Sequence, residues 1–372
     1  MAVFAGKWGK LSLGMLALVP ICVVLRLIGA DPLLIFAVAG VAVIPLAHIL
    51  GFATEEMGKH AGPGIGGLLN ATFGNAVELI IAMMALTRAA GMDALGTVEG
   101  DAAAENLKHV VQASITGSII GNILLVLGLS LLVGGLKYKT QKFSAHAAML
   151  QVTMMALAVA ALVMPELFAL SYPGEISVGV NVSLAISVLL IVAYFLGLVF
   201  SLHTHKDLFN PVTEHDEKPV WSKRFSLAVL LGATALVGLV AEILVSAVEG
   251  ATSALGLTEL FMGVMIIAIV GNAAEHGTAV VMAWKNKMDL SVGIATISSA
   301  QIALFVTPVL VLLSFALGST MTLAFEKFEL VAIILSVAIV SLIARDGESN
   351  WYEGALLLLL YAVIGVSLYF HP

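Results

Sequence analysis

Cysteine and charged residues are scarce in this 372-residue chain. Cys22 is the only cysteine, so no disulfide can form within the chain and a cysteine-rich metal site is excluded. Charged residues make up 11 % of the sequence, whereas soluble domains contain about 25 %. Hydrophobic residues make up 60 %, and the net charge of −7 gives no reason to expect a nucleic-acid partner. The composition therefore indicates an integral membrane protein without a soluble catalytic domain.

Continuous apolar runs occupy most of the chain. A membrane-spanning helix needs about 20 apolar residues, and the runs do not alternate as the strands of a membrane barrel do. We therefore predict an all-α polytopic membrane protein with about eleven transmembrane helices. The predicted spans are residues 11–29, 32–53, 65–88, 108–133, 143–164, 176–200, 225–248, 258–284, 290–317, 324–344 and 352–370.

The distribution of lysine and arginine predicts the orientation of these spans. Of the 17 basic residues, Arg26, Arg88, Lys108 and Lys327 fall on one side of the predicted membrane. The remaining thirteen fall on the side of the N-terminus. Because cytoplasmic loops are enriched in lysine and arginine, we expect a cytoplasmic N-terminus.

The most hydrophilic connection, residues 201–224, follows the sixth predicted span and divides the chain. Residues 1–30 then form a leading helix, and five predicted spans lie on each side of the connection. A repeat with an odd number of spans enters the membrane the second time with the opposite orientation, as in many transporters. We therefore predict inverted five-helix repeats at 31–200 and 225–372, joined by a cytoplasmic linker at 201–224.

One short motif occurs in the second span of each predicted repeat, as GNAVE at 74–78 and GNAAE at 271–275. It places Glu78 and Glu275 inside apolar spans, where ionisable side chains are costly and usually functional. A single such glutamate has a common alternative role as a buried, hydrogen-bonded structural residue. Two copies at matching places favour a functional site.

The other motif residues also suit an ion site. Asn75 and Asn272 lie three residues before the glutamates, so each amide shares a helix face with its carboxylate. Gly74 and Gly271 permit a break in the helix that would free backbone carbonyls beside the carboxylate.

Carboxylate, amide and carbonyl oxygens are the ligands that Ca²⁺ prefers, at about six to eight per ion. Two opposed carboxylates would be neutralised by one divalent cation or by two protons. The motif pair therefore predicts exchange of a divalent cation for protons, with Ca²⁺ as transported substrate and no cofactor.

Polar residues in the following span of each repeat are further candidates. We predict Ser118, Ser299 and Gln301 as additional cation ligands, although small and hydroxyl residues also serve ordinary helix packing in membranes. His276, next to Glu275, is a candidate proton relay or gate, with a packing histidine as the alternative. The polar residues ranked lower are Gln112, Ser114, Thr116, Asn122, Thr296, Ser298 and Thr307.

These motifs resemble the two signature repeats of the calcium/proton exchanger (CAX) family of the cation/Ca²⁺ exchanger superfamily. The likeness extends to VVQASITGSIIGNILLVLG at 110–128, THKDLF at 204–209 and SSAQIALFVTP at 298–308. The resemblance implies eleven helices arranged as one plus five plus five. It also implies a cation site built on Glu78 and Glu275, and it matches the family histidine with His276.

The resemblance implies a secondary antiporter that exchanges cytoplasmic Ca²⁺ for protons by alternating access. A sodium-coupled Ca²⁺ exchanger is the alternative, but its repeats carry a Pro-Glu version that neither GNAVE nor GNAAE has. A cation channel would need a continuous filter, and a zinc protease would need a His-Glu-x-x-His helix, which the sequence lacks. We expect a multi-pass protein in the lipid bilayer of a prokaryotic plasma membrane. Assembly into a homo-oligomer stays open.

Overall fold

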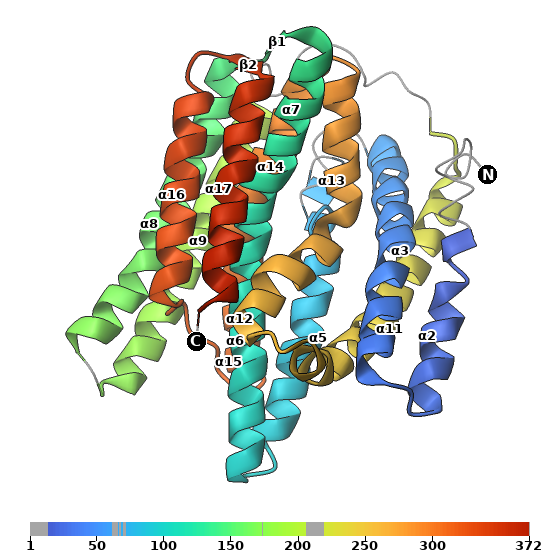
Figure 1. The fold of residues 1–372 in the computed structure, drawn as a ribbon, viewed down its shortest axis with the longest axis vertical. Coiled ribbons are helices and arrows are strands. Elements are labelled where there is room, and N and C mark those ends of the chain that lie inside the picture. Colours follow the sequence, from blue (N-terminus) through green and yellow to red (C-terminus); the bar gives the residue numbers. More distant parts are fainter. Residues whose placement is uncertain are drawn as a thin grey trace. The chain divides into compact units, whose positions relative to one another are not determined.

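The computed structural model describes residues 14–61, 66, 68–69, 72–172, 174–205 and 219–371. Helices make up almost all of this part of the chain, so the prediction of a helical membrane protein is confirmed (Figure 1). The elements are, in order, α2 (Leu18–Leu27), α3 (Pro32–Ala61), α5 (Ala76–Asp93), α6 (Val98–Ile120), η2 (Gly121–Val126), α7 (Leu127–Tyr138), β1 (Thr140–Lys142), α8 (Ala145–Ser171), α9 (Ile176–Val199), η3 (Phe200–Thr204), α11 (Lys223–Leu255), α12 (Glu259–Phe261), η4 (Met262–Ile267), α13 (Ala268–Trp284), α14 (Met288–Gln301), η5 (Ile302–Val306), α15 (Thr307–Ala316), α16 (Lys327–Ile343), β2 (Glu348–Asn350) and α17 (Trp351–Tyr369).

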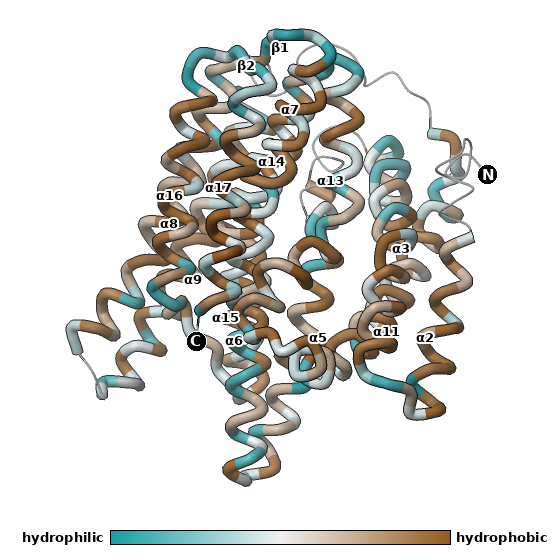
Figure 2. The backbone as a smooth tube through the Cα atoms, viewed as in Figure 1, coloured by the Kyte–Doolittle hydropathy of each residue, from teal (hydrophilic) through white to brown (hydrophobic). Residues whose placement is uncertain are grey.

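Within the described part of the chain, eight helical segments are long and apolar enough to cross a membrane. Hydrophobic residues follow most of these helices, whereas hydrophilic residues gather around β1 and β2 (Figure 2). The other three predicted spans are helical too, but α2 has 10 residues, α16 has 17 residues, and α5 carries Glu78, Arg88 and Asp93. The total of eleven spans therefore stays a prediction.

Short polar side chains fix where several helices begin. Thr97, Ser144, Ser222 and Asn350 each precede a helix and accept a hydrogen bond from a backbone N–H in its first turn. These N–H groups have no acceptor inside the helix. The capping side chains supply one, so the donors are not buried without a hydrogen bond. The start of a helix is thus set by its capping residue as much as by the apolar run.

The described residues fall into two compact units. The first unit comprises the residues up to Ala85 together with 197–257 and 270–274. In it, α3 packs along α11, and α2 packs against both helices. Arg26 of α2 donates to Ser246 Oγ at 2.7 Å and pairs with Glu242 at 3.1 Å, which attaches the leading helix to α11.

The end of α3 anchors the chain that enters α11. Glu56 is fully buried, and its Oε2 accepts hydrogen bonds from the backbone N–H of Val220 at 2.7 Å and of Trp221 at 2.8 Å. Its Oε1 pairs with Lys59 at 3.0 Å. The buried charge is therefore fully satisfied. Residues 206–218 of the predicted linker lie outside the described residues.

The second unit comprises 86–196, 258–269 and the residues from Glu275 onward. In it, α6 packs closely on η4. A Cβ atom at Gly117 would lie 2.2 Å from the carbonyl oxygen of Val264, so only glycine permits this approach. β1 and β2 pair antiparallel, with Thr140 opposite Asn350.

Each compact unit contains segments from before and after the predicted linker. The compact units and the predicted repeats at 31–200 and 225–372 are therefore different divisions of the chain. The inverted symmetry of the repeats stays a prediction.

Candidate cation site

The first motif lies at the start of α5. The chain turns at Gly74 and Asn75, and the helix begins at Ala76. The carbonyl oxygen of Asn75 accepts a hydrogen bond from the N–H of Leu79 at 3.1 Å, which opens the helical ladder. Glu78 therefore sits in the first turn, where the helix dipole favours a negative charge. Its side chain is largely buried, with 9 % of the residue exposed.

The second motif approaches the first within the first unit. A Cβ atom built on Gly271 would lie 3.3 Å from Cγ and 3.4 Å from Oε1 of Glu78. Contacts this short force a neighbour to move, so a side chain at position 271 would press on the carboxylate. Gly271 thus leaves the space that the Glu78 side chain occupies.

The predicted helix break at Gly271 is wrong. α13 runs without interruption from Ala268 to Trp284, through the whole second motif. The reason for a glycine at this place is the close approach of Glu78, not a turn of the backbone. Asn75 and Asn272 are both buried, so each amide has to be satisfied inside the protein.

Glu275 belongs to the second unit, where Ser298 of α14 contacts its carboxyl group. The hydroxyl of Ser298 forms a hydrogen bond with the Glu275 carboxyl. Asn122 Nδ2 in turn donates to Ser298 Oγ at 3.1 Å. Among the residues that the structure describes, none forms a hydrogen bond with the buried Oε2 of Glu275. This oxygen can therefore accept a proton or coordinate a cation.

Ser298 and Asn122 were among the polar residues that the sequence ranked lower as cation ligands. Ser299 was preferred, but its hydroxyl lies 2.9 Å from the carbonyl oxygen of Ala295 and 3.3 Å from that of Ile119. That geometry fits helix packing. In the sequence, Asn122 follows Gly117, the glycine that lets α6 approach η4, by five positions.

Three π-helical segments lie beside the predicted site residues. Asn122 lies in η2, η4 ends shortly before the second motif, and η5 follows Gln301 directly. Such segments widen the helix and shift its hydrogen bonds, and they occur often at functional sites. Thr307 Oγ1 donates to the carbonyl oxygen of Ile302 at 2.8 Å, which satisfies one group freed by η5.

The remaining predicted residues lie on helices of the second unit. Ser118 is buried on α6, and Gln301 is the half-buried last residue of α14. In the described part of the chain, nothing forms a hydrogen bond with the buried Nε2 of His276. The role of His276 as a proton relay or gate stays a prediction.

Within the described ranges, no group of three or more histidine, cysteine, aspartate or glutamate side chains could hold a metal ion. The two motifs and Ser298 supply carboxylate, amide and hydroxyl oxygens. This is the donor set of a hard cation such as Ca²⁺.

The chain resembles known transporters over nearly its whole length. Residues 32–203 and 225–370 match the family described as "Sodium/calcium exchanger protein". The "Ca(2+)/H(+) antiporter" of Synechocystis sp. is 43 % identical over 98 % of both chains. The "Ca(2+)/H(+) antiporter ChaA" of Bacillus subtilis is 44 % identical, covering 94 % of this chain and 96 % of that protein.

Solved structures give the same result. The structure of native YfkE matches with a TM-score of 0.79 at 40 % identity, covering 96 % of this chain and 98 % of that chain. The H⁺/Ca²⁺ exchanger CAX matches with a TM-score of 0.72 over 96 % of this chain and 91 % of that chain. At 14 % identity, this second likeness concerns the fold alone. The protein is therefore a member of the sodium/calcium exchanger family and, within it, of the calcium/proton exchangers.

Proposed function

We propose that the protein is a secondary antiporter that exchanges cytoplasmic Ca²⁺ for protons by alternating access. Glu78 and Glu275 bind either Ca²⁺ or protons at one shared site. The observation that carries the proposal is the close approach of Gly271 to the Glu78 side chain. Gly271 belongs to the second motif and lies about one helical turn before Glu275 on α13. The antiporters named above as relatives support the choice of ions.

Charge balance explains the coupling. One Ca²⁺ neutralises two carboxylates, and so do two protons. A site that holds neither ion carries two uncompensated charges in an apolar setting, which is strongly unfavourable. Only the loaded forms of the site then reorient readily across the membrane, so the movement of one ion requires the counter-movement of the other.

The direction of transport follows from the proton gradient. Protons load on the acidic side and displace Ca²⁺, whereas on the cytoplasmic side protons leave and Ca²⁺ binds. The protein would then lie in the cell membrane with its N-terminus in the cytoplasm, as the distribution of lysine and arginine predicts.

Uptake of ⁴⁵Ca²⁺ into proteoliposomes tests the proposal. We expect uptake that requires a pH gradient, collapses with a protonophore and is unaffected by replacing K⁺ with Na⁺. Uptake driven by a Na⁺ gradient alone would establish the sodium-coupled alternative, and uptake without any counter-ion gradient would indicate a channel.

Substitution of Gly271 by alanine should weaken Ca²⁺ binding. The new methyl group would lie 3.3 Å from Cγ of Glu78 and displace the carboxylate. Overpacking of this kind costs about 1–3 kcal/mol, which corresponds to roughly 5- to 150-fold in affinity. Isothermal titration with Ca²⁺ in detergent measures the effect.

Gly277→Ala is the matched control for Gly271→Ala. Gly277 lies on the same helix, and a Cβ atom there would meet nothing within 4 Å. We expect parental Ca²⁺ affinity in this variant. Equal affinities in both variants would show that the space at Gly271 is not needed for the cation.

Substitution of His276 by alanine should slow exchange or shift its pH optimum while Ca²⁺ binding persists. The reason is that the buried Nε2 forms no hydrogen bond within the described residues, whereas an imidazole beside a carboxylate can transfer protons. Transport assays across a series of pH values, run beside Ca²⁺ titrations, separate the two effects. Parental rates at every pH would leave His276 as a packing residue.

A further inference from the structure

A second buried carboxylate lies at the start of α16, away from both motifs. Glu326 caps the helix and is exposed, whereas Glu329, three residues later, is only 2 % exposed. The backbone N–H of Glu326 donates to Oε2 of Glu329 at 2.9 Å. Among the described residues, none forms a hydrogen bond with the buried Oε1 of Glu329. The capping interaction therefore engages Oε2 of Glu329 and not Oε1.

The hydroxyl of Thr116 on α6 lies beside this carboxyl group. Thr116 is 1 % exposed, and in the described part of the chain its Oγ1 has no well-aligned hydrogen bond apart from this approach to Glu329. Buried polar atoms are rarely left in this state, because the loss of hydration is not compensated. The pair accommodates a proton without rearrangement: the Thr116 hydroxyl can donate to ionised Glu329, and neutral Glu329 can donate to Thr116.

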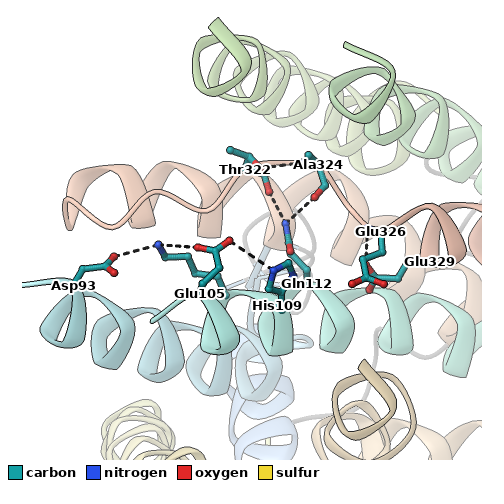
Figure 3. Close-up of polar contacts among 9 residues, drawn as sticks. Asp93, Glu105, His109, Gln112, Thr322, Ala324, Glu326 and Glu329 are labelled. Atoms are coloured by element: carbon teal, nitrogen blue, oxygen red, sulfur yellow. Dashed lines mark hydrogen bonds and ion pairs between the residues drawn. The ribbon is translucent and has the colours of Figure 1, made fainter. Parts of the chain in front are cut away.

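The basic side chains on this part of α6, Lys108 and His109, lie against carboxylates other than Glu329 (Figure 3). Lys108 pairs with Asp93 at 3.1 Å and with Glu105 at 3.4 Å. His109 Nε2 lies 3.7 Å from Glu105 Oε1. The Lys108 ammonium therefore does not neutralise Glu329.

The amide of Gln112 is also engaged. Its Nε2 donates to the carbonyl oxygens of Thr322 at 3.0 Å and Ala324 at 3.2 Å, which fixes the segment before α16 on α6 (Figure 3). The other elements that pack against α16 contribute further titratable groups. These are His146 and Glu166 of α8, Tyr352, Glu353, Tyr361 and Tyr369 of α17, and His371 after α17.

The same helix leads from this pair to the Glu275 network. Thr116 lies near the end of α6, and Asn122 lies in η2, which continues it. At about 1.5 Å per residue, the two positions are about 9 Å apart along the axis. Asn122 bonds to Ser298, and Ser298 bonds to Glu275. All of these residues belong to the second unit.

We propose that Glu329, with Thr116, is a proton-transfer group that takes up protons from the non-cytoplasmic solvent and passes them towards Glu275. A hydronium ion protonates Glu329 near exposed Glu326. The proton then moves through the Thr116 hydroxyl and water to the Glu275 carboxylate, so Glu329 becomes ionised again as Glu275 becomes neutral. This inference rests on the proposed Ca²⁺/H⁺ exchange.

Glu329→Gln tests the role without removing the cap, because glutamine at this helix position also accepts the hydrogen bond from Glu326. We expect proton-driven ⁴⁵Ca²⁺ uptake to fall by roughly 100-fold, the low end of what a positioned proton-transfer group contributes. Ca²⁺/Ca²⁺ exchange, which moves no net protons, should stay near the parental rate. Thr116→Val should also slow only the proton-driven mode, and Thr116→Ser should restore it.

Glu326→Gln is the matched control, because it alters an exposed carboxylate of the same capping box, and parental rates are expected in both modes. Parental proton-driven uptake in Glu329→Gln would overturn the proposal, and so would equal loss of both modes. Failure of the parent to exchange Ca²⁺ for protons would refute the proposed function itself. Infrared titration gives a readout independent of transport: a protonated-carboxyl band present in the parent should be absent from Glu329→Gln.

Discussion

Replacement of Glu78 by glutamine is expected to abolish Ca²⁺/H⁺ exchange. Glutamine keeps the shape of the side chain against Gly271, so the packing of the first unit should change little. The amide can neither release a proton nor neutralise a cation. Removing one partner of a buried charge pair costs about 3–5 kcal/mol, which corresponds to a loss of affinity of more than about a hundredfold.

The measurement is ⁴⁵Ca²⁺ uptake into proteoliposomes under a pH gradient, with Ca²⁺ titration of the same preparation in detergent. Glu55→Gln is a suitable control, since Glu55 lies on α3 in the same unit with 57 % of its side chain exposed and pairs with Lys59. We expect parental uptake in the control, because exposed ion pairs contribute little. Near-parental uptake by Glu78→Gln would remove Glu78 from the mechanism.

Much of the fold could be predicted from the sequence because membrane helices leave a strong signal. An apolar run of about 20 residues is visible without any knowledge of tertiary contacts. Each of the eleven predicted runs overlaps a helix in the described residues, although residues 11–13, 65, 67 and 70–71 lie outside them. The ends were harder to predict. For example, α3 continues to Ala61 because Glu56 and Lys59 form polar contacts there.

The details of the site were less accessible, because they depend on contacts between distant segments. The sequence placed Glu78 and Glu275 correctly within helices. It also placed Asn75 on a helix, where the chain turns, and it assigned Gly271 to a break. Only the approach of Glu78 explains that glycine. The position of Ser298 beside the Glu275 carboxyl was hidden from the sequence for a similar reason. Adjacent residues on a helix face different neighbours, and periodicity alone did not show which of them faces Asn122.

The pairing of Thr116 with Glu329 illustrates the same limit. Neither residue belongs to a repeated motif. In the sequence, Glu329 lies near the start of the predicted span 324–344, and no pattern there indicates a function. The burial of its side chain follows from the packing of α16 on α6 and α8. A glutamate beside an N-cap is common on helix surfaces, so the sequence pattern predicts a cap and no more.

The apparent affinity for Ca²⁺ should fall steeply as the pH is lowered. Protons and Ca²⁺ compete for the same two carboxylates, and the ligand groups must be ionised before the cation binds. If each bound Ca²⁺ displaces two protons, the affinity changes by up to about 100-fold per pH unit in the acidic limit, where both carboxylates are protonated. The two groups share one site, so they release their protons as a coupled pair.

Ca²⁺ titration in detergent between about pH 5 and 8 measures this dependence. Glu275→Gln leaves one competing carboxylate, so the limiting slope should drop from about two decades to about one decade per pH unit. Glu329→Gln should keep the parental slope, since Glu329 supplies protons but does not bind the cation. A flat profile in the parent would show that protons and Ca²⁺ do not compete, and the exchange mechanism based on Glu78 and Glu275 would then be wrong.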